Sequence, residues 1–324
     1  MSRLLITGGA GFIGSHLVHA AVARGHAVTV IDDLSTGQQE RLAEVAGRIR
    51  FIEASLLDDA ALDDALAGVE AVLHQAALPS VPKSIALPLV THRANAEGTL
   101  ALLDACHRHR IHRLVYAASS SAYGDQPAAS KSETLNPRPL SPYAVQKLAG
   151  EDYCRVFHHL FGVETIGLRY FNVFGPRQDP RSVYAAVIPA FITGMLRGER
   201  PNVYGDGHQS RDFTFVENIV DANFAALAAP AEACGRVYNA ACGMRTSLLE
   251  LVTALNGVLG TDLAPRFLPA RPGDVLHSCA DVRAAAAALS WRPAIQLAEG
   301  LRRTVAWYRA VAAATKPTAV ARLA

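Results

Sequence analysis

The sequence predicts an α/β fold in which a doubly wound parallel sheet carries a smaller, mixed α/β lobe. Three observations support this prediction. Short runs rich in Val, Ile and Leu alternate with amphipathic stretches over the first half of the chain, a glycine-rich turn follows the first run, and an acidic residue ends the second. Strands that helices cover on both faces have near-continuous apolar sequences of this kind.

The expected helices and strands follow one another in a regular order along this first half. A helix is predicted from Gly11 to Arg24, directly after the first strand, and another over residues 143–161. Helical stretches also separate the remaining strands. The predicted strands cover residues 3–7, 27–32, 48–53, 71–74, 113–118 and 165–171.

The alternation ends after residue 171, where loops rich in Gly, Pro and Arg appear. We therefore predict a first domain over residues 1–171 and a smaller second lobe over residues 172–324. The chain is expected to return to the sheet around residues 212–242, which makes the second lobe discontinuous.

Charge and composition exclude several classes of function. The formal net charge is +2, and the basic residues are scattered without a Lys/Arg run, so no nucleic-acid partner is expected. The apolar stretches are too short to cross a membrane, and the N-terminus shows no signal peptide. The five cysteines are widely spaced and in no metal-ligand pattern, so we expect reduced thiols, no metal site and a cytoplasmic protein.

A glycine-rich loop, TGGAGFIGSH, connects the first predicted strand to the first helix. Gly8, Gly11 and Gly14 allow a tight turn, and the helix N-terminus then offers free N–H groups to a pyrophosphate. Asp32 ends the second strand 18 residues after Gly14, where its carboxylate can bind both hydroxyls of an adenosine ribose and repel a 2′-phosphate. The pattern predicts a Rossmann-type domain that binds NAD rather than NADP; the alternative is a plain tight turn.

The stretch SPYAVQK, residues 141–147, places Lys147 four residues after Tyr143 on one face of the predicted helix. An ammonium beside a phenol favours the phenolate, and a bound nicotinamide cation favours it further. Together they bring a group with an ordinary pKa of about 10 towards the range of a general base. The alternative is a lysine packed over a half-buried tyrosine.

Three serines follow the strand predicted over residues 113–118, at the carboxyl edge where doubly wound sheets bind their ligands. Ser119 is the first of them and precedes Tyr143 by 24 residues. Its hydroxyl is placed to hydrogen-bond the substrate oxygen that Tyr143 deprotonates. Three serines in a row can also be ordinary loop residues.

At these residues the sequence resembles the extended short-chain dehydrogenase/reductase family, and the match runs from Leu4 to about Trp307. Further motifs in the same order are HQAA, N-x-x-G-T, LRYFNVFGP, SRDF and RPGD. The resemblance implies bound NAD, held by a Rossmann domain over residues 1–171. The residues that it places around NAD are Gly8, Gly11, Phe12, Ile13, Asp32, Ser35, Thr36, Gly37, Ser55, Leu56, Gln75, Ala76, Ala77, Asn95, Tyr143, Lys147 and Tyr170.

Within this family, the residues after Ser119 distinguish the reactions. Sugar-nucleotide 4,6-dehydratases carry an acidic pair there and decarboxylating relatives usually carry a carboxylate, whereas this sequence has Ser120 and Ser121. Because neither serine can act as a carboxylate acid or base, oxidation and re-reduction at one carbon remain, which is 4-epimerisation of a UDP-sugar. The resemblance implies Tyr143 as the base, Ser119 as its partner on the sugar oxygen, and Lys147 on the nicotinamide ribose.

The second lobe, residues 172–324, resembles the UDP-sugar-binding region of such epimerases. By that match Arg211 and Arg271 neutralise the diphosphate, and Asp274 lies by the uridine ribose or holds Arg271. Each arginine can alternatively be a surface charge. The residues that the match places around the substrate are Ser119, Ser120, Ser121, Tyr143, Asn172, Ala186, Val187, Asn202, Val203, Tyr204, Arg211, Arg271, Asp274 and Ser278.

Ser278 occupies a position that varies with the sugar in this family. A tyrosine there leaves room only for a hydroxyl at C2, whereas a small residue admits an N-acetyl group. The expected substrates are therefore UDP-N-acetylglucosamine and UDP-N-acetylgalactosamine. UDP-glucose and UDP-galactose, a UDP-uronic acid, and a non-catalytic NAD-binding regulator stay open as alternatives, as does a neutral loop role for Ser278.

Two positions depart from the family pattern. Ala54, Ser55 and Leu56 replace a Gly-Asp-aliphatic sequence, so a serine stands where an aspartate ordinarily touches adenine, and Pro272 replaces an acidic residue. The resemblance also implies a homodimer formed through helices that include the one bearing Tyr143.

Overall fold

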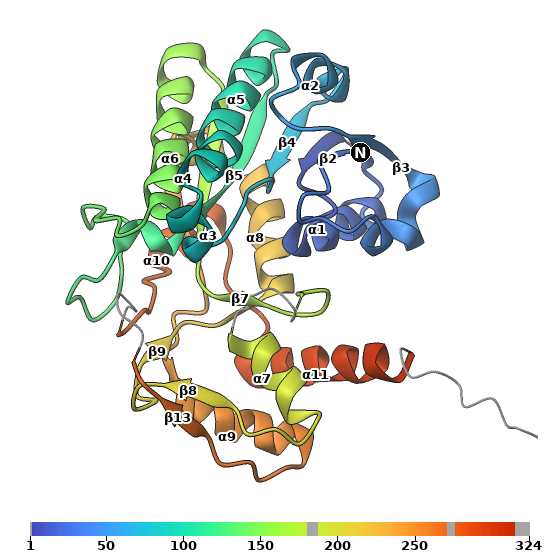
Figure 1. The fold of residues 1–324 in the computed structure, drawn as a ribbon. Coiled ribbons are helices and arrows are strands. Elements are labelled where there is room, and N and C mark those ends of the chain that lie inside the picture. The colour runs from blue at the N-terminus through green and yellow to red at the C-terminus, as the bar shows by residue number, and fades with distance from the viewer. Residues whose placement is uncertain (1, 180–186, 271–275, 315–324) are drawn as a thin grey trace, which may run out of the picture.

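The computed structural model describes residues 2–179, 187–270 and 276–314. Its centre is a seven-stranded, all-parallel sheet with the strand order β3-β2-β1-β4-β5-β6-β11 (Figure 1). The strands are β1 (Arg3–Thr7), β2 (Ala27–Asp32), β3 (Ile49–Glu53), β4 (Ala71–His74), β5 (Arg113–Ser119), β6 (Glu164–Tyr170) and β11 (Arg236–Ala240).

Helices bury both faces of this sheet, as a parallel sheet requires. One face packs against α1 (Phe12–Ala23), α8 (Val216–Ala228) and α10 (Arg283–Leu289). The other face packs against α2 (Asp59–Leu66), α5 (Gly98–Arg108) and α6 (Pro142–Phe161). Shorter turns complete this part: η1 (Gln39–Arg48), α3 (Val81–Ala86), α4 (Pro88–His92), η2 (Arg93–Glu97), η3 (Ser120–Tyr123) and η4 (Ala231–Ala233).

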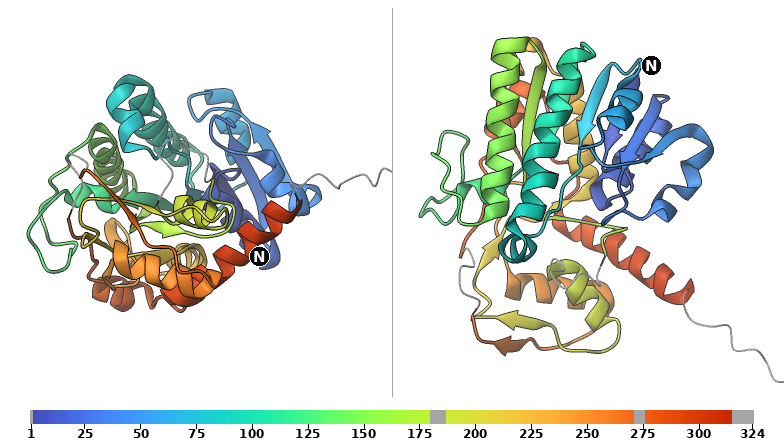
Figure 2. Two further views of the ribbon diagram at one scale, coloured as in Figure 1. Left: turned by 60° about the horizontal axis from the view of Figure 1, so that its bottom comes forward. Right: turned by 45° about the horizontal axis from the view of Figure 1, so that its top comes forward.

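The second lobe lies below the carboxyl edge of the sheet in Figure 1 and has an apolar core of its own. Helices supply most of that core, and three short strand pairs, β7–β10, β9–β12 and β8–β13, accompany them (Figure 2). The pair β8–β13 lies at the side of the lobe away from the sheet (Figure 1). Its elements are β7 (Val173–Phe174), α7 (Val187–Met195), β8 (Asn202–Tyr204), β9 (Ser210–Arg211), β10 (Thr214–Phe215), β12 (Thr246–Ser247), α9 (Leu248–Leu259), β13 (Arg266–Leu268) and α11 (Leu297–Ala314).

The predicted α/β fold class is confirmed, and the six predicted strands differ from the observed ones by at most one residue at an end. The helix predicted over residues 143–161 is α6, which begins one residue earlier. The chain re-enters the sheet at β11, which pairs with β6, and α10 packs against this edge as well.

The ends of α6 follow directly from its sequence. Ser141 is the N-cap, and its hydroxyl accepts a hydrogen bond from the backbone N–H of Ala144 at 3.2 Å. Pro142 occupies the first helical position, where its missing N–H costs nothing. At the other end Gly162 adopts a left-handed conformation with φ of +71°, which terminates the helix. The SPY sequence therefore fixes Tyr143 in the first turn.

A buried ion pair joins α6 to the sheet. Arg169 of β6 donates two hydrogen bonds to the carboxylate of Glu151 on α6, at 2.9 and 2.6 Å, and only 3% and 6% of the two residues' surface is exposed. Glu151 lies four residues beyond Lys147 and eight beyond Tyr143, so the three side chains share one face of the helix. Burial raises the pKa of Glu151, and the bonds from Arg169 oppose this rise.

Replacing Arg169 by methionine leaves Glu151 buried without its partner. We therefore expect Arg169→Met to lower the free energy of unfolding by about 3–5 kcal/mol, measured by urea denaturation. Arg108→Met is the matched control: Arg108 pairs with Asp63 and Asp104 on the surface, where its loss costs under about 1 kcal/mol. Equal, small losses in both variants would contradict a structural role for the buried pair.

Candidate active site

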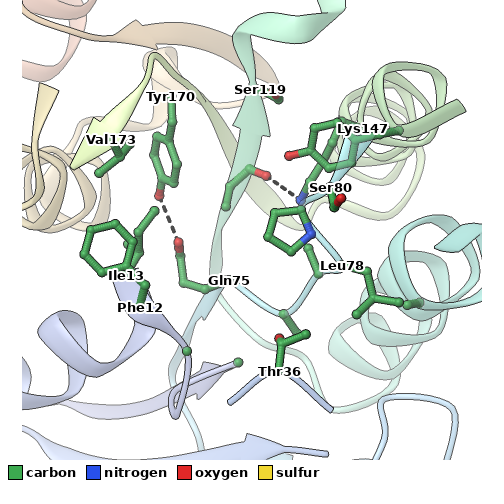
Figure 3. Close-up of a pocket in the computed structure, with 18 of the residues that line it drawn as sticks. Phe12, Ile13, Thr36, Gln75, Leu78, Ser80, Ser119, Lys147, Tyr170 and Val173 are labelled. Atoms are coloured by element: carbon green, nitrogen blue, oxygen red, sulfur yellow. Dashed lines mark hydrogen bonds between the residues drawn. The ribbon is translucent and has the colours of Figure 1, made fainter. Parts of the chain in front are cut away.

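A cavity of about 830 Å³ lies at the carboxyl ends of β1, β2, β4 and β5, next to the second lobe. The strand order changes direction between β1 and β4, and ligands of doubly wound sheets bind at such a switch point. Ser119 lies at the end of β5 within this cavity, with Gln75 and Tyr170 on one side and Lys147 on the other (Figure 3).

The glycine loop forms the floor of the first half of this cavity. Gly8 has φ of +66°, and a Cβ built on Gly14 would lie 2.0 Å from the carbonyl oxygen of Gly8. The loop therefore closes this tightly only with glycines at these positions. Gly11 caps α1 without any side-chain hydrogen bond, so the helix N-terminus faces the cavity with backbone donors suited to a pyrophosphate.

Asp32 lies at the end of β2, where it lines the cavity and is only 7% exposed. Its carboxylate accepts hydrogen bonds from the backbone N–H groups of Ala10 at 2.8 Å and Leu34 at 2.9 Å. Burial raises the pKa of Asp32, and these two bonds oppose the rise. Each carboxylate oxygen retains acceptor capacity for a ribose hydroxyl. The loop and Asp32 together therefore fit the dinucleotide NAD.

The three serines after β5 form a small network beside Tyr143. Ser119 Oγ accepts hydrogen bonds from the backbone N–H of Ser121 at 3.2 Å and from its hydroxyl at 2.8 Å. Burial raises the pKa of Tyr143, and a hydrogen bond between Tyr143 and Ser119 opposes this rise. With its acceptor positions occupied by Ser121, the Ser119 hydroxyl is oriented towards Tyr143 and the cavity.

Lys147 is 3% exposed and reaches from α6 to the end of β5, where its ammonium donates to the carbonyl oxygen of Ala117 at 2.8 Å. In return, the hydroxyl of Tyr116 donates to the backbone carbonyl of Lys147 at 3.2 Å. Burial lowers the pKa of Lys147 to about 8, while nearby Cys154 and Glu151 act in the opposite direction. The ammonium is therefore still mostly protonated at neutral pH.

The pKa of Tyr143 differs from the sequence-based expectation. We expected Lys147 to bring it down, but in the protein itself burial raises the pKa of Tyr143, and the bond with Ser119 is what opposes the rise. The physical reason is that a buried phenolate loses its hydration, while the Lys147 ammonium is already engaged with Ala117.

Most of the predicted site residues come together in this cavity. From the second half of the chain, Asn172, Arg211 and Ser278 reach it, and the backbone N–H of Ser278 donates to the Ser210 carbonyl at 3.1 Å. The other predicted residues that line it are Gly8, Gly11, Phe12, Ile13, Asp32, Ser35, Thr36, Ser55, Leu56, Gln75, Ala76, Ala77, Ser119, Ser120, Ser121, Tyr143, Lys147 and Tyr170.

Several predicted residues lie elsewhere. Gly37 packs under Asp32, since a Cβ there would be 2.6 Å from the carboxylate. Asn95 is buried behind the wall, where its amide bonds the backbone of Leu78 and the side chain of Gln146 on α6. The predicted substrate-binding residues that are described but do not line the cavity are Val187, Asn202, Val203 and Tyr204. Ala186, Arg271 and Asp274 fall outside the described residues, as does Pro272.

The cavity also contains residues that the sequence did not indicate. Arg41 and Asp179 line its cofactor end, and Tyr123, Lys131 and Leu140 line the end near Ser278. Their positions depend on loops whose course no local sequence pattern predicts. The one feature of the sequence that could have drawn attention to Lys131 is the scarcity of lysine, since the chain has only four.

Within residues 2–179, 187–270 and 276–314, no group of three or more His, Cys, Asp or Glu side chains is placed to hold a metal ion. Over the same ranges, no helix is long and apolar enough to cross a membrane. All five cysteines are free thiols.

Comparison with known proteins gives consistent results over the whole chain. The family model "NAD dependent epimerase/dehydratase family" matches residues 4–241. A UDP-glucose 4-epimerase from Mycolicibacterium smegmatis is 39% identical over 312 residues, covering 95% of this chain and 98% of the relative.

Two solved structures extend the comparison. UDP-N-acetylglucosamine 4-epimerase from Methanobrevibacter ruminantium M1, in complex with UDP-N-acetylmuramic acid, is 41% identical, with a TM-score of 0.90 and coverage of 96% of this chain and 99% of that one. A dTDP-glucose 4,6-dehydratase from Streptomyces venezuelae, solved with NAD bound, is 32% identical, with a TM-score of 0.88 and coverage of 97% and 99%. This chain therefore belongs to the NAD dependent epimerase/dehydratase family.

Proposed function

We propose that this protein is an isomerase that inverts the configuration at C4 of a UDP-sugar, with NAD as a resident cofactor. The observation that carries the proposal is the set of side chains around Tyr143, where Ser119, Ser120 and Ser121 supply hydroxyls in place of carboxylates. The family also contains dehydratases. The presence of serine hydroxyls rather than carboxylates after Ser119 therefore favours epimerisation over dehydration.

The carboxylates that line the cavity support this choice by their location. Among the described residues they are Asp32, Asp33 and Asp179. Arg41 interacts electrostatically with both Asp179 and Asp32, so these acids lie near one another, in the part of the cavity that we propose for the cofactor ribose. Dehydration needs an acid and a base beside the sugar, and the described part of the site offers neither in carboxylate form.

Each polar side chain near the sugar then has one task. Tyr143, as the phenolate, takes the proton of the sugar 4-hydroxyl and returns it to the opposite epimer. Ser119, held by Ser121, hydrogen-bonds the same oxygen and polarises the ketone. Lys147 is anchored by Ala117 through one of its three N–H donors, and binds the cofactor ribose with the others.

NAD, when bound, supplies the acceptor and donor for the hydrogen at C4 and a positive ring that stabilises the Tyr143 phenolate. The residues that hold it are those of the glycine loop, with Asp32 on the adenosine ribose. A Cβ on Gly8 would lie 2.6 Å from the backbone nitrogen of Ala76, just after β4, so only glycine allows the loop to pack this closely against the end of that strand.

Residues of the second lobe are proposed to hold the nucleotide while the sugar turns. Arg211 and Asn172 line the cavity below Ser119 and fit a diphosphate. Asn172 is held by a bond from its amide to the carbonyl of Asp212 at 3.2 Å, in a left-handed conformation with φ of +36°. Such a strained backbone persists where surrounding structure requires it, which supports a binding role.

The proposed substrate pair is UDP-N-acetylglucosamine and UDP-N-acetylgalactosamine. The small side chain of Ser278 lines the cavity and leaves room beside the sugar C2. The Methanobrevibacter ruminantium relative, an epimerase of UDP-N-acetylglucosamine, supports this choice. Plain hexoses and uronic acids remain as alternative sugars, and a non-catalytic regulator has no use for the Ser119–Tyr143–Lys147 arrangement.

A homodimer is part of the proposal. Large apolar side chains are exposed along α6, at Val145 and Leu160, and on the adjoining α3 and α4, at Ile85 and Leu89. A second copy of this chain is the occupant that we propose for this surface, in line with the family resemblance. The free thiols support a reducing compartment, and we place the protein in the cytoplasm.

Removing the phenol tests the base. Tyr143→Phe is expected to abolish measurable turnover, a loss of at least about 10²–10⁴-fold, because it removes the group that we propose takes the proton. NAD content and melting temperature should match the wild type. Tyr153→Phe, on the same helix, is the control and should keep its activity; an active Tyr143→Phe variant would refute the assignment.

The substrate is tested by incubating purified protein with UDP-N-acetylglucosamine, UDP-N-acetylgalactosamine, UDP-glucose and UDP-glucuronic acid, without added cofactor, and separating the products. Turnover of the acetylated pair is expected. Ser278→Tyr should then reduce this activity by at least about tenfold, because the ring fills the space beside C2, and should spare the interconversion of UDP-glucose and UDP-galactose. Equal losses on both kinds of sugar would reject Ser278 as the determinant.

The dimer is tested by light scattering after size exclusion. A Leu89→Lys/Leu160→Lys double variant should elute as a monomer, because two charges on the apolar surface oppose its burial. Phe267→Lys, which adds a charge on the exposed face of β13, is the control and should remain a dimer. A wild-type protein that is monomeric at micromolar concentration would rule out this part of the proposal.

A further inference from the structure

Lys131 is a lysine with unusual surroundings for its type. Only 2% of its surface is exposed, yet it belongs to a long loop rather than to the core, and it lines the cavity together with Tyr123, Leu140 and Ser278. Lysine is rarely buried to this extent unless a partner compensates its charge. The Lys131 ammonium therefore needs hydrogen-bond acceptors, and a ligand bound in the cavity can supply them.

The backbone of Lys131 is held beside the sugar determinant Ser278. Its N–H donates to the carbonyl of Cys279 at 2.7 Å, and its own carbonyl accepts from the N–H of Asp281 at 2.8 Å, which forms a parallel bridge with Ala280. The amide of Asn239 on β11 donates to the same carbonyl at 2.9 Å. Lys131 and the segment that carries Ser278 are thus positioned as one unit.

The ammonium of Lys131 is only partly satisfied by the protein. It donates to the backbone carbonyl of Gln126, and within the described ranges no carboxylate lies at ion-pair distance from it. An ammonium has three donors, so further acceptors can bind. Burial lowers its pKa, and Asp125 acts against this from a distance.

A small residue at position 278 admits an acylated sugar but does not attract it. Space alone gives an enzyme that accepts both acylated and plain sugars, whereas selection requires a contact that one substrate makes and the other lacks. An acyl oxygen at C2 is such an acceptor. A plain sugar has only a hydroxyl at C2, which is shorter by the whole acyl group. The buried Lys131 ammonium then lacks this acceptor.

We propose that Lys131 is a specificity-determining residue that donates a hydrogen bond to the acyl oxygen of the 2-acylamino group of the sugar. This inference rests on the proposed function and deepens it, because it turns the opening beside Ser278 into a subsite with a positive preference. A carboxylate on C6 of the sugar is a second possible acceptor for the ammonium, and UDP-glucuronic acid tests this alternative.

The test compares Lys131→Met with wild type on UDP-N-acetylglucosamine, UDP-glucose and UDP-glucuronic acid. The methionine retains the buried stem but not the donors. We expect the ratio of kcat/KM for the acylated over the plain sugar to fall about 10- to 100-fold, chiefly through KM, with NAD content unchanged. Lys131→Arg keeps the donors and should restore the ratio to within about threefold.

Arg245→Met is the matched control, because Arg245 donates to the carbonyl of Ala129 in the same loop but does not line the cavity, so its loss should leave the ratio unchanged. An unchanged ratio in a folded Lys131→Met variant would overturn the inference, and so would a loss confined to UDP-glucuronic acid. A wild type inactive on every acylated sugar would instead refute the proposed function itself.

A measurement on the wild type covers the case in which Lys131→Met does not fold. The N-trifluoroacetyl analogue of UDP-N-acetylglucosamine has a similar shape but a weaker acceptor oxygen. Its kcat/KM should fall below that of the N-acetyl substrate by about threefold or more through KM, since charge-assisted bonds depend on acceptor strength. Equal KM values for both substrates would overturn the inference.

Discussion

The hydrogen bond from the Lys147 ammonium to the Ala117 carbonyl is the contact on which the site depends. It attaches α6 to the end of β5, and the bond from Tyr116 back to Lys147 doubles the attachment. A buried ammonium needs such an acceptor. A shift of α6 relative to β5 would therefore leave the Lys147 charge buried without a hydrogen-bond partner, which is costly. Since Tyr143 lies on the same helix face and Ser119 ends the same strand, this one buried charge fixes the relative positions of Ser119, Tyr143 and Lys147, the three groups of the proposed mechanism.

The two ends of the cavity differ in kind. At the cofactor end, glycines and carboxylates are arranged by short local sequences, with Gly14 packed on Gly8 and Asp32 bonded to Ala10. At the sugar end, the wall is assembled from segments distant in the sequence, with Lys131 against the segment after Ser278.

The sequence predicted the sheet, the glycine loop and α6 because each depends on neighbours along the chain: apolar alternation, turn glycines, and the cap formed by Ser141 and Pro142. Contacts between distant segments were not predictable in this way. The Arg169–Glu151 pair and the burial of Lys131 arise only once strands and loops are assembled. Asn95 shows the same limit. Its motif predicted a contact with the cofactor, whereas in the structure its side chain hydrogen-bonds Leu78 and Gln146 and so connects the loop after β4 to α6.

The central claim is that this site oxidises and re-reduces a single carbon. The most direct measurement uses UDP-N-acetylglucosamine with deuterium at C4, purified protein and no added cofactor, with the label located by NMR. We predict that both epimers carry deuterium at C4 and that none appears in solvent. Deuterium at C6, the mark of a reaction that also eliminates water, would contradict it.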